Sequence, residues 1–312
     1  MTIAVVTGGA GFIGSNLVRA LLDRGDAVRV VDDLSTGRRE NIADIENKIE
    51  FYQTSICDCD ALPPIFEGAD VCYHQAALAS VPRSIADPTT TNHVNVTGTL
   101  NVFVAARDAG VRRVVYASSS SVYGDAETVP VEETYPLCPI SPYAVSKAAN
   151  ELYARNFFEL YGIEMVGLRY FNIFGPRQDP HSHYSAVIPI FVRRMLEGNP
   201  PIVHGDGQQS RDFTYIENVV NANIKAADHK GTLSGVFNVA CGRSTSLLTM
   251  IEYLNQAMGS GFEPEYGPPR SGDITTSFAD ISRAREAFGY EPAVHIEEGL
   301  RRTVAWYMEH QS

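Results

Sequence analysis

Long apolar runs and an excess of positive charge are both missing from this 312-residue chain. Its sequence contains no uninterrupted stretch of about 18 apolar residues that could span a bilayer. Only 25 Lys and Arg residues stand against 37 Asp and Glu residues, and the net charge of −12 repels nucleic-acid phosphates. The first residues lack the basic start and the cleavage site of a signal peptide. We therefore expect a cytoplasmic protein without a nucleic-acid or membrane partner.

Cysteine is also sparse, with five residues, an odd number in a chain that is too long to need disulfides. The only close pair, Cys57 and Cys59, lacks the spacing of a zinc-binding CxxC motif. The eight histidines are scattered, and the neighbours His181 and His183 lie among loop-forming residues. We therefore expect free thiols and no metal site.

Apolar residues make up 44% of the chain, which is enough for a large core. They form short valine-rich runs that alternate with helical patterns, as buried parallel strands joined by helices do. The predicted strands are residues 3–7, 27–31, 71–74, 114–118 and 164–171, and the predicted helices are residues 13–24, 100–109 and 143–161. Ser141 can cap the last helix, and Pro142 suits its first position. The pattern predicts an α/β fold, a Rossmann-type doubly wound parallel sheet.

The texture of the sequence changes near residue 173, where glycine- and proline-rich turns begin. We expect a first, dinucleotide-binding domain over residues 1–172 and a smaller, interleaved α/β substrate domain over 173–312, mainly 173–212 and 242–312. A helix at 213–228 and a strand at 236–240 are predicted to return to the first sheet, so segments of about 213–241 belong to the first domain.

Three glycines, Gly8, Gly11 and Gly14, lie between the first predicted strand and the first predicted helix. Glycine permits a tight turn and lets the backbone approach a pyrophosphate, which the helix N-terminus attracts. Asp32 ends the second predicted strand, where a carboxylate accepts both ribose hydroxyls and repels a 2′-phosphate. Asp33 could share this role. The pattern predicts NAD as the cofactor.

Tyr143 and Lys147 are four residues apart and share one face of a predicted helix. A phenol is a poor base at neutral pH, and a cation within about 4 to 6 Å lowers its pKa by favouring the phenolate. A predicted strand leads into four serines, residues 118–121, at the sheet edge where α/β proteins bind ligands. A hydroxyl there can hold the proton of a substrate alcohol opposite the tyrosine.

Eight segments together carry a family resemblance: Thr7–Gly14, Val31–Leu34, His74–Ala77, Ser118–Gly124, Tyr143–Lys147, Leu168–Asn172, Ser210–Phe213 and Arg270–Asp273. Through them the sequence resembles the extended short-chain dehydrogenase/reductases over essentially its whole length. Within that family it looks like the UDP-hexose 4-epimerases, most of all the branch that acts on UDP-N-acetylglucosamine (UDP-GlcNAc). The resemblance implies interconversion of UDP-GlcNAc and UDP-N-acetylgalactosamine (UDP-GalNAc), with UDP-glucose and UDP-galactose as further candidate substrates.

The resemblance also implies the catalytic roles. Tyr143 would be the general base for the sugar 4-hydroxyl, Lys147 would bind the nicotinamide ribose and lower the pKa of the tyrosine, and Ser119 would hydrogen-bond the reacting oxygen. The four-serine run leaves Ser120 as the neighbouring choice. Hydride would pass from the sugar to NAD and return to the other face of a 4-keto ring.

A larger set of residues is implied at the cofactor. It comprises Gly8, Gly11, Phe12, Ile13, Gly14, Asp32, Asp33, Ser55, Ile56, Asp58, His74, Ala76, Ala77, Asn95, Tyr143, Lys147 and Tyr170. The family often has Gly-Asp-Ile where Thr54-Ser55-Ile56 stands here, so the adenine contact is open between Ser55 and Asp58.

The same resemblance implies a UDP-sugar site. Its residues are Asn172, Gln178, Ala186, Val187, Arg211, Arg270, Asp273 and Ser277. Guanidinium groups suit the diphosphate, which Arg211 and Arg270 would meet. Ser277 stands at a position that gates sugar size in the family, where a small residue admits a 2-N-acetyl group.

Other functions remain as alternatives. A 4-epimerase of UDP-glucuronate or of its N-acetylated analogue would need a cation for the substrate carboxylate, and Arg83 or Arg177 could supply it. Dehydratases and decarboxylases need an acid where Ser120 and Ser121 stand, and a non-catalytic NAD-binding sensor would not need Tyr143 and Lys147. The family likeness further implies a homodimer through helices near residues 95–109 and 143–161.

Overall fold

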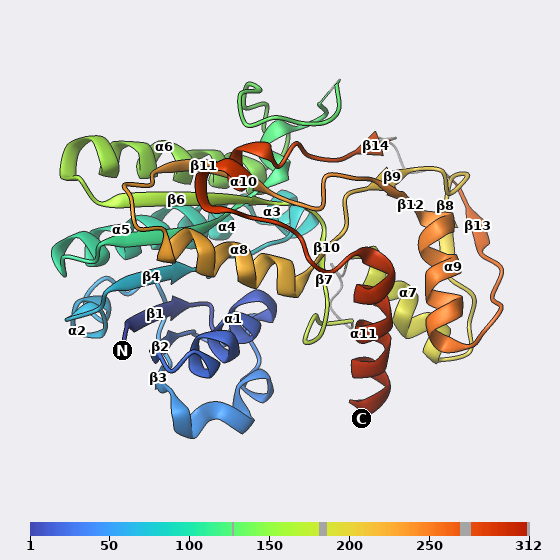
Figure 1. The fold of residues 1–312 in the computed structure, drawn as a ribbon, viewed down its shortest axis with the longest axis horizontal. Coiled ribbons are helices and arrows are strands. Elements are labelled where there is room, and N and C mark those ends of the chain that lie inside the picture. The colour runs from blue at the N-terminus through green and yellow to red at the C-terminus, as the bar shows by residue number, and fades with distance from the viewer. Residues whose placement is uncertain (127, 181–185, 269–275, 311–312) are drawn as a thin grey trace.

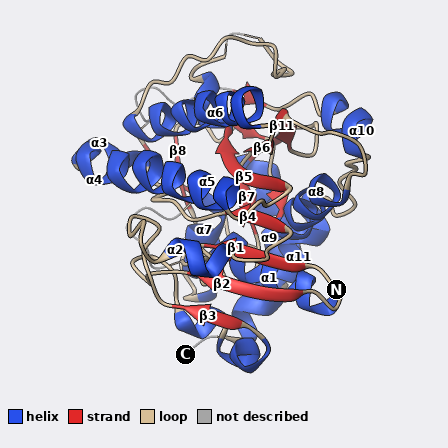
Figure 2. Cartoon of the chain, turned by 90° about the vertical axis from the view of Figure 1, so that its left-hand side faces the viewer, coloured by secondary structure: helices blue, strands red, loops and turns tan. Residues whose placement is uncertain are grey.

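The computed structural model describes residues 1–126, 128–180, 186–268 and 276–310. Seven parallel strands form the central sheet, in the order β11-β6-β5-β4-β1-β2-β3 (Figures 1 and 2). Their bounds are β1 Ile3–Thr7, β2 Ala27–Val31, β3 Glu50–Tyr52, β4 Val71–His74, β5 Arg113–Ser119, β6 Glu164–Tyr170 and β11 Gly235–Val239. This sheet confirms the predicted fold class. The short edge strand β3 was not predicted, because three residues are too few to establish an apolar pattern.

Helices cover both faces of the sheet (Figure 2). One face carries α2 Leu62–Phe66, α5 Thr99–Asp108 and α6 Pro142–Tyr161, and the other carries α1 Phe12–Asp23 and α8 Ile216–Asp228. On the first face Phe103 packs edge-to-face against both Tyr116 and Phe157, with ring centroids 5.6 Å apart in each pair. Edge-to-face packing favours the positive ring edge against the negative ring face.

Helix α6 begins and ends as the sequence predicts. The Ser141 hydroxyl accepts a hydrogen bond from the Ala144 N–H at 3.2 Å, and Pro142 occupies the first turn. The helix stops at Gly162, whose φ of 73° lies in the left-handed region that favours glycine. This long helix carries Tyr143 and Lys147 along the sheet.

Beyond β6 the chain builds a second group of elements, at the right of Figure 1. The helices are α7 Val187–Leu196, α9 Leu247–Met258 and α11 Ile296–Glu309, whereas α10 Ser282–Phe288 packs against β11 of the central sheet. The pairs of short strands are β7 Ile173–Phe174 with β10 Thr214–Tyr215 and β8 Ile202–His204 with β13 Glu265–Gly267. A three-stranded sheet has the order β12 Thr245–Ser246, β9 Ser210–Arg211 and β14 Thr276–Ser277. Helices α3 Val81–Ala86 and α4 Pro88–Asn92, with a π-helical turn at His93–Gly98, lead into α5.

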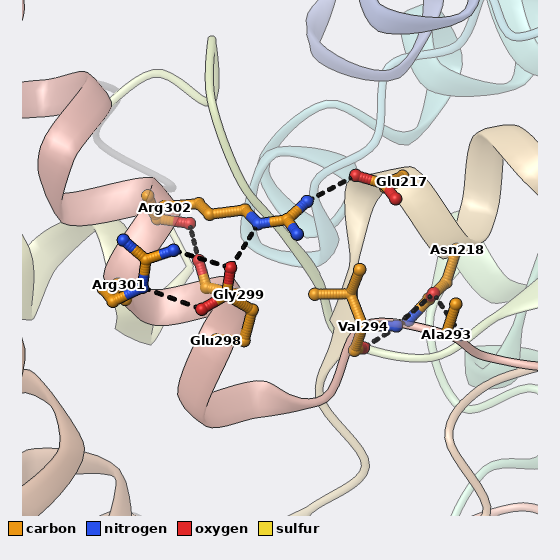
Figure 3. A network of polar contacts seen from close by, with 9 residues as sticks. Glu217, Asn218, Ala293, Val294, Glu298, Gly299, Arg301 and Arg302 are labelled. Atoms are coloured by element: carbon orange, nitrogen blue, oxygen red, sulfur yellow. Dashed lines mark hydrogen bonds and ion pairs between the residues drawn. The ribbon is translucent and has the colours of Figure 1, made fainter.

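Helix α8 joins the two groups of elements, since it packs near the central sheet and also binds the C-terminal region (Figure 3). Arg302 of α11 donates to Glu217 at 2.7 Å. The Asn218 side chain donates to the Val294 carbonyl at 2.6 Å and accepts from the N–H groups of Ala293 and Val294. One buried apolar cluster runs from α1 across α8 into α7, α9 and α11, so the groups share a core.

All five cysteines are free, as expected. In the described ranges, no helix combines the length and the apolar character that crossing a membrane requires. The same residues contain no cluster of three or more His, Cys, Asp or Glu side chains arranged to hold a metal ion.

Candidate active site

The glycine loop fits a dinucleotide because its backbone is too tightly packed for side chains. A Cβ atom on Gly14 would lie 2.1 Å from the Gly8 carbonyl oxygen, and one on Gly8 would lie 2.6 Å from the Ala76 nitrogen. Gly8 also has a φ of 69°. The loop therefore leaves bare backbone at the start of α1, where N–H groups attract anions.

Asp32 lies at the end of β2 and is nearly buried. Its carboxylate accepts the N–H groups of Ala10 and Leu34, both at 2.9 Å, and burial raises its pKa. Gly37 packs behind it, since a Cβ there would lie 2.6 Å from Asp32 Oδ1. Each carboxylate oxygen has a second lone pair, so the group can still accept ribose hydroxyls. Asp33 is exposed, and its carboxylate accepts the nearby Ser35 N–H at 2.9 Å.

A cavity of about 670 Å³ lies at the carboxyl ends of β1 and β2. Of the predicted cofactor residues it is lined by Gly8, Gly11, Phe12, Ile13, Gly14, Asp32, Asp33, Ile56, Ala76 and Ala77. Arg83 and Arg177, the candidate contacts for a substrate carboxylate, line this cavity as well. Thr54 and Ile56, which follow strand β3, also line this cavity. Ser55 and Asp58 instead accept the N–H groups of Cys57 and Ala61, within their own turn.

His74 and Asn95 make buried hydrogen bonds that connect the elements around the cavity. The His74 ring lies 2.7 Å from the Thr7 hydroxyl and 2.9 Å from the Thr99 hydroxyl. Burial lowers the pKa of His74 to about 3, so the ring is neutral at physiological pH. Asn95 is fully buried and ties Leu78, in the cavity wall, to Ser146 of α6. His74 thus connects β4 to β1 and α5, and Asn95 connects the cavity lining to α6.

Ser119 and Tyr143 come together between β5 and α6. The Ser119 hydroxyl accepts hydrogen bonds from the Ser121 N–H at 3.2 Å and the Ser121 hydroxyl at 2.9 Å. The Ser119 side chain is also close enough to the Tyr143 phenol to oppose part of the rise in the pKa of Tyr143. Ser120 starts a short 3₁₀ turn, Ser120–Tyr123. The structure thus brings Ser119, of the four serines, to the phenol.

Lys147 lies beneath the phenol, nearly buried, and donates to the Ala117 carbonyl at 2.8 Å. Its Nζ is 5.8 Å from the centroid of the Tyr143 ring. Burial raises the pKa of Tyr143, and the Ser119 side chain opposes the rise. Burial also lowers the pKa of Lys147 to about 8. That Lys147 lowers the pKa of the phenol therefore stays a prediction, and desolvation acts in the opposite direction.

Tyr170 and Asn172 follow at the end of β6. The Tyr170 hydroxyl contacts the side chains of Gln75 and Asn223 at 3.2 Å, so its polar end points into the protein. Asn172 is exposed, has a φ of 36° and donates its amide to the Asp212 carbonyl at 3.1 Å. Backbone strain of this kind clusters at ligand sites.

Arg211 and Ser277 are direct neighbours across β9 and β14, although 66 residues separate Ser210 from its own β14 partner, Thr276. Asp212 anchors this sheet. Its fully buried carboxylate accepts the N–H groups of Cys241, Gly242 and Ala279, and burial raises its pKa to about 6. Asp212 holds the strands that carry Arg211 and Ser277 against the end of β11.

The remaining residues predicted to bind the substrate do not lie together in the described structure. Gln178 lines a second cavity, of about 990 Å³, between α1 and the C-terminal helix α11. Ala186 and Val187 begin α7. Arg270 and Asp273 lie outside the described residues.

Several residues at the site were not predicted. They include Gly37 behind Asp32, Asp212 in the β9 sheet, and a buried ion pair between Glu151 and Arg169 whose closest atoms are 2.6 Å apart. Glu151 follows Lys147 by four residues, a spacing that places both on one helix face and was the available signal.

A glycine-loop cavity at the carboxyl ends of parallel strands, beside a Tyr-xxx-Lys helix, defines a Rossmann enzyme that binds a nicotinamide dinucleotide. The model of the NAD dependent epimerase/dehydratase family matches residues 4–240. The chain belongs to this family, and its cofactor is NAD.

Relatives refine this assignment. The chain is 42% identical to the UDP-glucose 4-epimerase of Mycolicibacterium smegmatis over 307 residues, 97% of each protein. It is 35% identical to the UDP-glucuronate 4-epimerase of Thermodesulfobacterium geofontis, over 98% of this chain and 96% of that one. The solved UDP-N-acetylglucosamine 4-epimerase of Methanobrevibacter ruminantium, in complex with UDP-N-acetylmuramic acid, matches with a TM-score of 0.94 and 41% identity, over 99% and 98% of the chains. The resemblance to UDP-hexose 4-epimerases is confirmed, and the enzyme is an isomerase.

Proposed function

We propose that this enzyme is an NAD-dependent 4-epimerase of UDP-sugars whose preferred pair is UDP-GlcNAc and UDP-GalNAc. The observation that carries the choice of sugar is the pairing of Ser277 with Arg211 on adjacent strands. Neighbouring strands lie about 4.8 Å apart, so a small side chain leaves room beside the guanidinium. A diphosphate held by Arg211 would place the sugar against this space.

Tyr143 removes the proton of the sugar 4-hydroxyl in the proposed mechanism. A bound NAD⁺ would supply the hydride acceptor and donor for the sugar and a positive charge that favours the phenolate. Ser119 holds the reacting oxygen, since its hydroxyl already meets Tyr143. Lys147, whose ammonium lies near the tyrosine ring and donates to the Ala117 carbonyl, would hold the nicotinamide ribose. The same tyrosine returns the proton when the opposite stereoisomer forms.

The cofactor residues are proposed on the same basis. The bare backbone of Gly8, Gly11 and Gly14 would receive the pyrophosphate, and Asp32 would accept the adenosine ribose hydroxyls. The alternative substrate UDP-glucuronate is less well supported, because Arg83 and Arg177 line the cavity of the glycine loop. Arg177 also donates to Asn16 of α1 at 3.1 Å, which occupies part of its guanidinium.

Separate incubations with UDP-GlcNAc, UDP-glucose and UDP-glucuronate test the substrate. We expect kcat/KM to be highest for UDP-GlcNAc, with the sugar isomers resolved by chromatography. Equal or faster conversion of UDP-glucose, or conversion of UDP-glucuronate alone, would contradict the proposed preference.

A Ser277→Tyr variant tests the cause of that preference. The added ring should fill the space beside Arg211 and lower kcat/KM for UDP-GlcNAc by at least about tenfold, since a pocket discriminates by roughly that factor for small changes in volume. UDP-glucose serves as the internal control, because it lacks the acetyl group. A parallel decline for both sugars would show that Ser277 does not gate sugar size.

We also propose a homodimer through α6. Val145, Leu152, Tyr153 and Leu160 form an apolar stripe on the outer face of this helix, and Leu152 is 61% exposed in the single chain. Exposed apolar patches of this kind mark interfaces between proteins. A Leu152→Glu variant should sediment as a monomer and the parent as a dimer, whereas Met308→Glu, on α11, should leave the dimer intact. A monomeric parent would refute the proposal.

A further inference from the structure

Glu151 links α6 to the central sheet directly behind the candidate catalytic residues. It lies one helical turn after Lys147 and is nearly buried. Its carboxylate accepts the Ser118 hydroxyl at 2.5 Å and two guanidinium contacts from Arg169, at 2.8 and 2.6 Å. Ser118 and Arg169 are themselves paired across β5 and β6. One carboxylate therefore holds the helix against two adjacent strands.

Three side chains of α6, spaced four residues apart, meet three consecutive residues of β5. Tyr143 contacts Ser119, Lys147 donates to the Ala117 carbonyl, and Glu151 accepts the hydroxyl of Ser118, which lies between them. The contact with Ser118 is made by Glu151, to which the proposed mechanism gives no chemical step. It sets the register between helix and strand at the point where Ser119 meets the phenol.

The charge of Glu151 is balanced on both sides. Arg169 also donates to the Tyr123 hydroxyl at 2.8 Å, and Tyr123 in turn donates to Asn238, so the guanidinium is firmly held. Toward the active site the carboxylate faces the Lys147 ammonium and raises its pKa, against the lowering by burial. The other titratable groups that face Lys147 are the neutral His74 from β4 and Tyr143 from its own helix.

We propose that Glu151 is a positioning residue, which holds Ser119 and the Lys147 ammonium in register with Tyr143. The proposal rests on the proposed function, in which these three groups act on the sugar and the nicotinamide ribose. A carboxylate with this role must keep both its charge, toward Lys147, and its contact with Ser118.

Two variants separate the charge from the contact. Glu151→Gln keeps the shape and removes the charge, and Ser118→Ala keeps the Glu151–Arg169 pair and removes the bond to β5. The matched control is Glu164→Gln, which disrupts another Glu–Arg pair, with Arg113, at the opposite end of β6. The control reports what the loss of an ion pair does when the site is untouched.

The titration of Lys147 provides a readout that needs no substrate. The sequence has only four lysines, Lys48, Lys147, Lys225 and Lys230, so selective ¹³C labelling of lysine gives a spectrum of few signals. We expect the Lys147 midpoint near pH 8 in the parent, a lower pH in Glu151→Gln, and no change in Glu164→Gln. An unchanged Lys147 midpoint in folded Glu151→Gln overturns the proposal.

Turnover of UDP-GlcNAc completes the test. We expect Ser118→Ala to lower kcat about tenfold with little change in KM or in the unfolding temperature, because an interaction made in the transition state is weakened. Equal loss of kcat in Glu164→Gln, or an unchanged kcat in Ser118→Ala, overturns the proposal. Absence of turnover in the parent would refute the proposed function instead, while the lysine titration would still report on Glu151.

Discussion

Replacing Tyr143 by phenylalanine should lower kcat for UDP-sugar epimerisation by about 10³-fold, within the range that general acid–base catalysis contributes. The phenol is the group on α6 that meets Ser119, and its ring lies 5.8 Å from the Lys147 ammonium. Phenylalanine keeps the ring and its packing and removes only the proton-transferring oxygen. NAD binding should therefore change little, and the unfolding temperature should stay close to that of the parent.

Tyr266→Phe is the control, since Tyr266 lies on β13, outside the site and the α6 stripe, and is 61% exposed. Isomer ratios followed over time, together with NAD titration of each protein, make the comparison. Epimerisation by Tyr143→Phe at the parental rate would remove the basis of the proposed mechanism.

Replacing Gly14 by alanine should weaken NAD binding about a hundredfold and destabilise the fold by about 2 kcal/mol, the usual cost of forcing an extra carbon into a packed site. The new Cβ would lie 2.1 Å from the Gly8 carbonyl oxygen and 2.7 Å from the Gly9 Cα, and backbone atoms cannot rotate aside as a side chain can. The loop and the start of α1 would have to separate, and N–H groups there would move away from a pyrophosphate.

Gly261→Ala serves as the control, because a Cβ at that position meets nothing within 4 Å. Calorimetric titration with NAD and thermal unfolding should separate the two variants clearly. If Gly14→Ala binds NAD as tightly as the parent does, the glycine loop is not the pyrophosphate site.

Local features of the fold could be predicted because their causes are local. Strands β1, β2 and β4 were found at their observed bounds from valine-rich runs, and the cap of α6 from the neighbours Ser141 and Pro142. The glycine loop could be located for the same reason, since glycine spacing and its position between strand and helix are visible in sequence. These patterns determined the fold class, the cofactor and the family.

Burial decided what local patterns could not. The spacing of Tyr143 and Lys147 was read correctly as a shared helix face, but the direction of the tyrosine pKa depends on desolvation by the surrounding protein. Likewise only the structure shows that the polar atoms of His74 bond to Thr7 and Thr99, and that the Tyr170 hydroxyl bonds to Gln75 and Asn223. A motif reveals which residues gather near a site, but not where each side chain points.

The sequence by itself determined the alternating strands and helices, the glycine loop and the Tyr-xxx-Lys helix, because each depends on residues within a few positions of one another. Only the tertiary structure placed Ser277 beside Arg211, anchored that sheet through Asp212, and joined Glu151 to Ser118 and Arg169. These contacts join distant segments: strand pairing brings Ser277 to Arg211, and the buried carboxylates of Asp212 and Glu151 need hydrogen-bond partners that lie far away in the sequence.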